Sequence, residues 1–364
     1  MDNFFDYFTR LVKSHIKRYY KSSIDIDALA FNLTKIEDAS SAKGIIVIMD
    51  SNFVKDNIDL AYRSIQFYKT DLTYFGSGYH LNNNDWTPYP NIKNPLFWVN
   101  KVNGMLINWN YFEFSKLLLT HNFDDNFGLD KHMRLDELKM DKRHQNLFSK
   151  PIINEISAVI VEYYCKFIAK VNYLDQVKPI EIALSHDIDL IHGNDFFTQA
   201  IRLFKSLRDP KKLKYLFMNF AYPDKYHFDN IIKIIKIETE NKLSSSFYIL
   251  NGSIGRFKSR SSFARNKVFY KKLLKSGKVQ SNVFGVHYNY DTYMNSSKMK
   301  AQIMQIKEFG IPSIIVGRAH YLRFKYPESF IAIENNSINV DETVGFHSSL
   351  GFRTGVAGIY KPFN

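Results

Sequence analysis

The sequence predicts an α/β protein of two domains, the second of which is built on a mostly parallel sheet, open or closed into a barrel. The chain has 364 residues, of which 45% are hydrophobic and 16% aromatic, so it can form one large core or two smaller ones. From residue 180 onward, short apolar runs alternate with segments of helical periodicity. Such alternation is typical of strand–helix units that form a parallel sheet.

Residues 1–170 are expected to form an N-terminal mixed α/β accessory domain. The first segment, residues 1–21, has an apolar helical face made of Phe4, Phe8, Leu11, Val12 and Ile16. A helix of this kind can lie on a membrane, but it more often packs on its own domain.

Local patterns predict the other elements of this domain. The run 44–49 predicts a buried strand, the periodicity of 57–68 predicts a helix, and the aromatic stretch 96–114 is strand-like. Residues 152–168 are expected to form a helix that buries the single cysteine, Cys165. One thiol cannot form an internal disulfide, so the sequence does not indicate a disulfide-stabilised exported protein.

Residues 171–364 are expected to form the second domain, which begins with a linker over 171–179. Its candidate strands are 180–185, 244–250, 283–287, 312–316 and 338–346. The segments with helical periodicity between them are 196–207, 228–241, 266–275 and 297–309. Polar side chains gather where these strands end, and in a barrel this is the catalytic face.

Basic residues are concentrated in one part of the second domain. Between Arg202 and Lys278 the chain has 19 Lys or Arg against 5 Asp or Glu. A solvated face is the ordinary explanation of a charge run, but an excess this large favours an anionic partner. Anionic membrane headgroups, a pyrophosphate-linked saccharide and an acidic glycan all fit. Nucleic acid is not expected, because no zinc-finger spacing, RNA-binding signature or recognition-helix pattern is present.

The N-terminal segment does not have the composition of a secretory signal, because Asp2 and Asp6 interrupt it. No later window approaches the roughly 18 apolar residues that a transmembrane helix needs. The expected location is therefore the cytoplasm, with a peripheral position on the inner face of the membrane as an option.

The most informative segment is 181–189, where an apolar run stops at Ser185, His186, Asp187 and Asp189. A strand that delivers these side chains at its C-terminal end places them where α/β folds carry their chemistry. Carboxylates beside an imidazole suit a metal ion and a proton-accepting base. The two aspartates share a face of an extended strand end, so both can address one site. An Asp-rich turn after a core strand is the alternative.

Five segments of the second domain occur in a characteristic order. They are Leu-Ser-His-Asp-Ile-Asp at 184–189, Ser-Ser-Phe-Tyr-Ile-Leu at 245–250, Phe-Gly-Val-His-Tyr-Asn-Tyr-Asp-Thr at 284–292, Arg-Ala-His-Tyr-Leu-Arg-Phe at 318–324 and a C-terminal segment at 341–363. Together they resemble the polysaccharide deacetylase superfamily (NodB-like, carbohydrate esterase family 4), in particular a branch with an extra N-terminal domain that occurs with surface-polysaccharide genes. The resemblance covers roughly residues 180–364 and implies a distorted (β/α) barrel of NodB type.

In this superfamily an aspartate and two histidines hold a divalent metal, usually zinc, and a neighbouring aspartate accepts the proton of the attacking water. The resemblance implies that Asp187 is the base and that Arg318 orients it. It implies Asp189 and His287 as metal ligands. Asp291 occupies the position of the second histidine, which implies a site of two carboxylates and one histidine.

The other candidate residues have open alternatives. If Asp291 only caps a helix, the third ligand is His320, His192 or absent. His320 is otherwise the candidate catalytic acid, since His347 is offset from the position of the family's late catalytic histidine. His186 is a candidate substrate-site residue or a core residue. Arg353 can hold a carboxylate of the substrate at the barrel mouth or pair with Asp341.

The resemblance therefore implies a metal-dependent hydrolase that removes acetyl groups from an N- or O-acetylated sugar. Its substrate would be a bacterial surface polysaccharide or a lipid-linked precursor of one. Two alternatives belong to other classes of protein. One is a metal-poor relative that binds a glycan without hydrolysing it, and the other is a membrane-surface scaffold for polysaccharide assembly.

Overall fold

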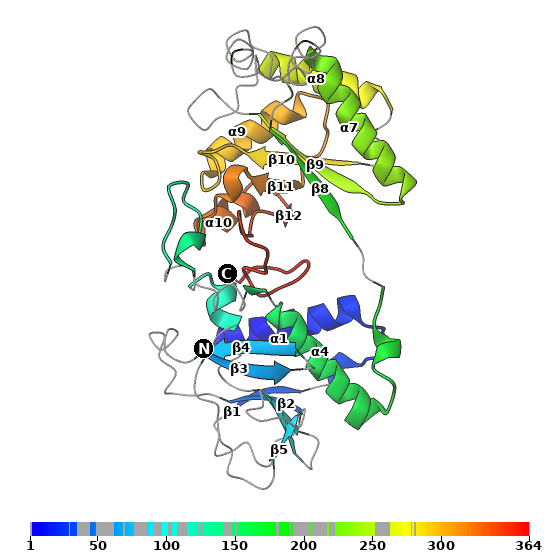
Figure 1. Cartoon of the computed structure of the whole chain (residues 1–364), viewed down its shortest axis with the longest axis vertical. Coiled ribbons are helices and arrows are strands. Elements are labelled where there is room, and N and C mark those ends of the chain that lie inside the picture. The colour runs from blue at the N-terminus through cyan, green and yellow to red at the C-terminus, as the bar shows by residue number, and fades with distance from the viewer. Residues whose placement is uncertain are drawn as a thin grey trace. The chain divides into compact units, whose positions relative to one another are not determined.

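The computed structural model contains two compact units, each of which is described by itself (Figure 1). Unit 1 comprises Met1–Asp130, Leu135–Ile180 and Gly345–Asn364, and unit 2 comprises Lys131–Arg134 and Glu181–Val344. The residues whose structure is described are 2–28, 30–34, 44–48, 62–67, 70–75, 86–89, 97–100, 104–107, 115–122, 124, 127–140, 148–149, 151–179, 182–189, 191, 204, 217, 223–251, 263–277, 279 and 282–363.

The sequence placed the domain boundary between residues 170 and 171, whereas the contacts change unit between residues 180 and 181. The expected linker 171–179 is tied to the end of helix α1 (Asp2–Tyr19) by backbone hydrogen bonds. The Lys21 N–H donates to the Gln176 carbonyl at 2.8 Å, and the Lys178 N–H donates to the Tyr19 carbonyl at 2.8 Å. Long-range pairing of this kind leaves no local pattern in the sequence.

Unit 1 contains a mixed sheet of five strands and two helices that pack on each other, α1 and α4 (Ile152–Tyr163). The strands in spatial order are β1 (Phe31–Thr34), β2 (Gly44–Ile48), β7 (Gly104–Ile107), β6 (Phe97–Asn100) and β5 (Trp86–Tyr89). Strands β1, β2 and β7 are parallel, and β6 is antiparallel to both of its neighbours. Short helical turns occupy Ile26–Ala28, Glu137–Lys139, Tyr164–Ala169 and Leu174–Gln176. The expected mixed α/β character is confirmed for this part of the chain.

The apolar face of α1 is buried in the core of unit 1, where it packs against α4. The predicted face residues are each at most 6% exposed: Phe4, Phe8, Leu11, Val12 and Ile16. Burial favours this packing by about 1.5–3 kcal/mol for each large apolar side chain. The apolar face of α1 is therefore buried inside unit 1, and is not exposed for contact with a membrane. Within the described residues, no helix combines the length and hydropathy needed to cross a bilayer.

The helix predicted over 57–68 is wrong at residues 62–67, which form strand β3 (Tyr62–Phe67). This strand pairs in antiparallel register with β4 (Thr70–Phe75). Aromatic and β-branched residues favour a strand once a partner is available, and here the partner follows almost at once. The remaining residues of the predicted helix lie outside the described part of the chain.

A buried histidine on α1 makes the stability of unit 1 depend on pH. His15 is 4% exposed, and its ring centroid lies 4.4 Å from that of Tyr19. Burial, with a smaller contribution from Arg18, lowers the pKa of the His15 imidazole to about 4. The unfolded chain, in which the pKa is about 6.5, therefore binds more protons between these two values. Stability is full above about pH 6.5 and is lost as the pH falls towards 4.

We expect His15 to cost up to about 3 kcal/mol of unfolding free energy between neutral pH and about pH 4. In His15→Leu the imidazole is gone, so the unfolding free energy should depend less on pH over that window. Urea unfolding of both full-length proteins at about pH 7 and about pH 4.5 measures the difference. An identical pH dependence in the two proteins would contradict the assignment.

Unit 2 is built on a parallel sheet of five strands that follow one another in chain order. The strands are β8 (Leu184–Ile188), β9 (Ser245–Leu250), β10 (Val283–Tyr288), β11 (Val316–Ala319) and β12 (Val340–Asp341). The helices are α7 (Pro223–Glu240), α8 (Phe263–Lys275), α9 (Ser296–Lys307) and α10 (Glu328–Glu334). The parallel α/β prediction is confirmed.

Some boundaries in unit 2 differ from the prediction. Strand β11 begins where the predicted strand 312–316 ends, and β12 is much shorter than the predicted 338–346. Helix α10 was not predicted, because its seven residues are too few to show a helical period. The predicted helix 196–207 lies outside the described residues apart from Phe204.

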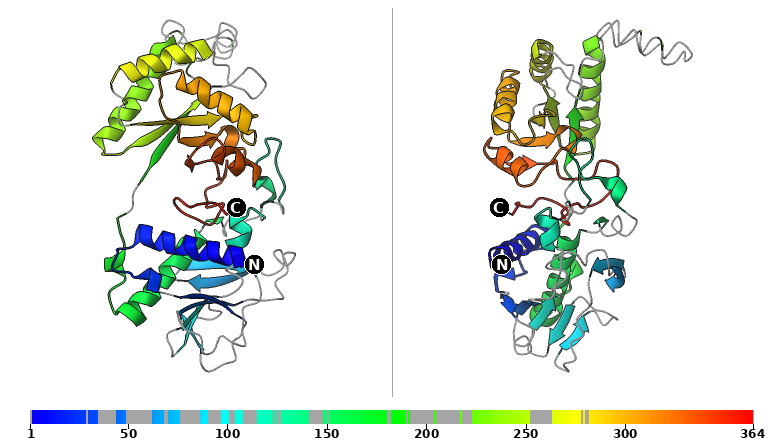
Figure 2. Two further views of the ribbon diagram at one scale, coloured as in Figure 1. Left: turned by 180° about the vertical axis from the view of Figure 1, so that it is seen from behind. Right: turned by 90° about the vertical axis from the view of Figure 1, so that its left-hand side faces the viewer.

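The two faces of the unit 2 sheet differ in character. Apolar side chains of β9 and β10 form a single core with the helices α7 to α10. These strand residues are Phe247, Ile249, Phe284, Val286 and Tyr288. A chain-order parallel sheet with right-handed crossovers brings its helices to one face, and Figure 2 shows α7, α8 and α9 together over the strands. Because side chains alternate along a strand, Asp187, His287 and Arg318 lie on the other face.

Candidate metal centre

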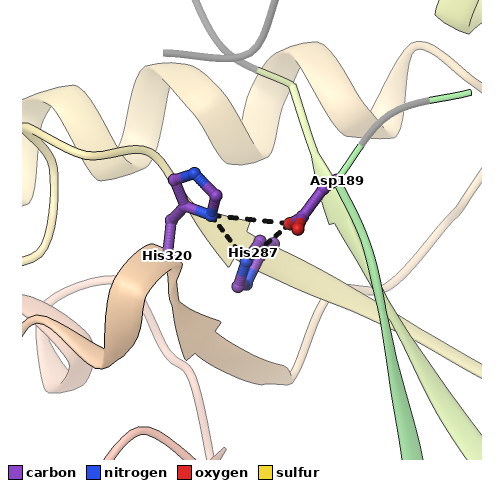
Figure 3. A group of neighbouring side chains, drawn as sticks. All are labelled: Asp189, His287 and His320. Atoms are coloured by element: carbon purple, nitrogen blue, oxygen red, sulfur yellow. Dashed lines mark hydrogen bonds and ion pairs between the residues drawn. The ribbon is translucent and has the colours of Figure 1, made fainter. Parts of the chain in front are cut away.

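The C-terminal edge of the unit 2 sheet brings Asp189, His287 and His320 together (Figure 3). Asp189 directly follows β8, His287 lies near the end of β10, and His320 begins a helical turn (His320–Leu322) after β11. The strands are in register at this edge, since Arg318 is opposite His287 and β8 runs parallel to β9 up to Ile188. The three side chains form a group that could hold a metal ion.

The distances within this group fit one face of a tetrahedral metal site. His287 Nε2 lies 3.1 Å from Asp189 Oδ1 and 3.1 Å from His320 Nδ1. His320 Nδ1 lies 3.4 Å from Asp189 Oδ1. Two ligand atoms at the usual zinc distances around a tetrahedral ion are about 3.3 Å apart, which agrees with all three separations. Three protein ligands are also the number found in catalytic zinc sites, which keep one position open.

The tautomer of His287 is fixed by a backbone contact. Its side chain is 2% exposed, and Nδ1 lies 2.9 Å from the carbonyl oxygen of Arg318. A carbonyl oxygen only accepts, so Nδ1–H donates and Nε2 of the neutral ring presents a lone pair to the group. Metal-binding histidines usually donate their second ring N–H in this way.

The electrostatics of the group also favour a bound cation. The contacts with His287 and then with His320 are the main causes of a lowered pKa of the Asp189 carboxyl, so Asp189 is ionised at neutral pH. The three atoms that face one another are Asp189 Oδ1, His287 Nε2 and His320 Nδ1. When both imidazoles are neutral, at most one of these atoms, His320 Nδ1, carries a proton. Lone pairs this close need a cation or further protons between them. One carboxylate oxygen and two imidazole nitrogens suit a borderline ion such as Zn²⁺.

Arg318 holds Asp187 beside this group. Arg318 Nη1 donates to Asp187 Oδ1 at 3.1 Å, and Nη2 donates to Ser185 Oγ and Glu342 Oε2, each at 2.5 Å. The second oxygen of Asp187, Oδ2, lies 3.9 Å from His287 Nε2. One oxygen of the carboxylate is thus held by the guanidinium, while the other faces the group. This is the orientation that a general base needs.

Gln302 of α9 fixes the backbone around His287. It is 3% exposed, its Nε2 donates to the His287 carbonyl at 2.7 Å, and its Oε1 accepts from the Asn289 N–H at 3.0 Å. Asn295 caps the N-terminus of this helix, because its side chain accepts from the Lys298 N–H at 3.0 Å. No sequence pattern singles out Gln302 or Glu342, because each acts through a partner that is distant along the chain.

Two of the predicted site residues in unit 2 have other surroundings. Asp291 is not in the metal-binding group found among the described residues, and its Oδ2 accepts from Lys298 Nζ at 3.2 Å. His320 occupies the place expected for Asp291 as third ligand. His186 Nε2 lies 2.5 Å from Glu238 Oε1, on the face of the sheet that packs against α7. His192, a further alternative, lies outside the described residues.

Arg353 and His347 lie in unit 1 and are engaged there. Arg353, whose side chain is 2% exposed, donates from Nη2 to Asp124 Oδ2 at 2.7 Å. Burial acts to raise the pKa of Asp124, but Arg353 and His121 lower it to about 2. The expected pairing of Arg353 with a substrate or with Asp341 is therefore replaced by a buried ion pair. His347 Nδ1 lies 2.5 Å from Glu137 Oε1.

A cavity of about 530 Å³ lies between β8 and α7 and reaches both aspartates of the site. Its lining includes Ser185, Asp187, Asp189, Asn230 and Ile231. Its volume lies within the range of small-molecule sites.

The fold and the side-chain group define a mixed α/β protein with a candidate three-ligand metal centre at the C-terminal edge of a parallel sheet. No protein-family model, curated protein or solved structure matches the chain.

Proposed function

We propose that this protein is a metal-dependent hydrolase that removes acetyl groups from an N- or O-acetylated sugar of a bacterial surface polysaccharide or its lipid-linked precursor. The observation that carries the proposal is the Asp189, His287 and His320 group with the Arg318-held Asp187 beside it. A metal site with an adjacent oriented carboxylate is the machinery that hydrolysis of an amide or ester needs. The order of the sequence motifs, which resembles that of polysaccharide deacetylases, supports the sugar as substrate.

The residues take distinct roles in this proposal. Asp189, His287 and His320 would hold the ion, for which Zn²⁺ is our proposal. The bound ion would supply Lewis-acid activation of the acetyl carbonyl and of the attacking water. Asp187 accepts the proton of that water through Oδ2. Arg318 fixes the orientation of Asp187 through the contact of Nη1 with Oδ1, while Ser185 and Glu342 hold Arg318 in place.

The finer fold belongs to the same proposal, which is a distorted (β/α) barrel of NodB type. The chain-order parallel sheet supports it, because a doubly wound sheet would reverse its strand order. The polar face opposite the helices supports it as well, since a parallel sheet is normally covered on both faces. A barrel would enclose that face.

The proposal also includes a binding partner for the basic region Arg202–Lys278. This partner is an anionic membrane surface or a lipid-linked substrate on the cytoplasmic side. The basic region Arg202–Lys278 supports it, and its described helices α7 and α8 expose lysines. These are Lys233, Lys236, Lys271, Lys272 and Lys275. Binding to anionic vesicles that weakens with added salt is the expected signature.

The test of the hydrolase is acetate release by the purified full-length protein from N-acetylated and O-acetylated oligosaccharides. Removal of metal with a chelator should reduce release to the background rate, and Zn²⁺ should restore it. The two substrates also decide between amide and ester hydrolysis. Release that continues unchanged in metal-free protein would contradict the proposal.

A second candidate function is that of a catalytically impaired protein of the deacetylase type. It would bind metal and a glycan but would hydrolyse neither an acetyl amide nor an acetyl ester. The pairing of His347 with Glu137 favours this candidate. His347 is the histidine that lies near the position of the family's late catalytic histidine, and in the structure it contacts Glu137 of unit 1. This candidate predicts stoichiometric metal and measurable glycan binding without acetate release.

A further inference from the structure

Four residues of the N-terminal half of the chain belong to unit 2. These residues, Lys131–Arg134, are here named the strap, and the residues directly before and after them, Asp130 and Leu135, belong to unit 1. His132 is the buried member, with 6% exposure. The strap lies beside the turn that carries His320.

A chain of ring contacts runs from the strap to the metal-binding group. The His132 ring stacks on Tyr321, with centroids 4.7 Å apart and an interplanar angle of 18°. Tyr321 meets His320 edge to face at 4.5 Å, and His320 meets His287 in the same manner at 5.1 Å. Each ring therefore limits the orientation of the next.

Arg323 anchors the strap to the loop after β10. Its Nε donates to the His132 carbonyl at 2.9 Å, and its Nη1 donates to the Tyr290 carbonyl. The guanidinium carbon lies 3.8 Å from the ring centroid of Tyr290 and 4.2 Å from that of Tyr293. The side chain of His132 contacts the same loop, with Nδ1 3.2 Å from Tyr290 Oη. Buried contacts of this kind fix both the backbone and the ring of His132.

The turn that carries His320 has an unusual backbone. Tyr321 has φ of 62° and Leu322 has φ of 53°, so two successive residues with side chains are left-handed. A left-handed residue with a side chain is strained and persists only where its surroundings determine it. Tyr321 is 37% exposed and is therefore only partly covered by other residues. The rings of His132 and His320 that contact it supply much of the packing that holds this backbone conformation.

We propose that His132 is a positioning residue for the metal centre, which through Tyr321 holds the His320 ring in its ligating orientation. The strap thus makes the N-terminal half of the chain contribute to the metal affinity of unit 2. The inference rests on the metal centre of the proposed function but not on the reaction. Partners that orient metal ligands typically change metal affinity by about 10- to 100-fold.

The test measures binding of Co²⁺ and Zn²⁺ to metal-free full-length protein, without substrate. His132→Ala should weaken binding by about 10- to 100-fold and change the visible spectrum of bound Co²⁺, which reports ligand number and geometry. His132→Phe keeps a flat ring against Tyr321 and should restore most of the affinity and the spectrum. The matched control is His15→Ala, which removes a His–Tyr ring contact in unit 1 and should bind metal as the wild type does.

A folded His132→Ala protein with wild-type affinity and spectrum would overturn the inference. If this variant does not fold, Tyr321→Ala serves instead, because it removes the middle ring of the chain from a partly exposed position. Tyr321→Ala should weaken metal binding to a similar extent, and wild-type affinity would overturn the inference equally. Wild-type protein that binds metal but releases no acetate would contradict the hydrolase alone, since affinity is measured without substrate.

Discussion

Asp187→Asn is expected to lower the rate of acetate release by about 10²- to 10⁴-fold, the usual contribution of a general base. Asparagine has nearly the same shape, and its side-chain oxygen can still accept from Arg318, so the fold and the metal site should persist. It cannot accept the proton of water at neutral pH. Steady-state kinetics should therefore show a lower kcat, while the metal content stays at the wild-type level.

The control for this variant is Asp229→Asn, the same change at an exposed position of α7 in unit 2. It should release acetate at the wild-type rate. If Asp187→Asn also retains the wild-type rate, Asp187 has no part in the mechanism. If it loses metal as well as activity, its role is structural.

His287→Ala is expected to have the largest effect on metal content. This side chain is 2% exposed, its tautomer is fixed by Arg318 O, and its Nε2 contacts both other members of the group. Removal of a ligand should weaken metal binding by more than the roughly 100-fold that is typical of a lost orienting partner. Acetate release should fall to background with it. Metal analysis after dialysis and titration of the metal-free protein measure the change.

The matched control is His186→Gln, which alters a histidine on the opposite face of the sheet. His186 pairs with Glu238 of α7 rather than with the metal-binding group. Its replacement should leave metal affinity unchanged. Equal losses in His186→Gln and His287→Ala would show that disturbance of the sheet, and not removal of a ligand, is responsible.

Much of unit 2 could be predicted from local sequence patterns. Strands β9 and β10 correspond to short apolar runs, and helices α7, α8 and α9 correspond to segments with a helical period. The residues Asp187, Asp189, His287 and Arg318 could be found because each follows an apolar run at the end of a strand. The resemblance to polysaccharide deacetylases made the same positions stand out.

The errors have a common physical cause. Residues 62–67 have helical spacing but form β3, because β4 offers a pairing partner. Asp291 stands where the resemblance expects a ligand, but His320 reaches the group from another strand end. Arg353 was assigned to substrate, yet it is paired with Asp124 in unit 1. For β3 the deciding contact was pairing with the neighbouring strand β4. For the ligand position and for Arg353 it was a contact with a residue distant in sequence.

By itself the sequence determined which segments become strands of the parallel sheet and which polar residues stand at their ends, because backbone periodicity and apolar runs act over a few residues. Only the tertiary structure decided that His320, and not Asp291, joins Asp189 and His287, that Arg353 pairs with Asp124, and that the strap reaches Tyr321. These choices depend on strand order, register and burial, which are set by contacts between residues far apart along the chain.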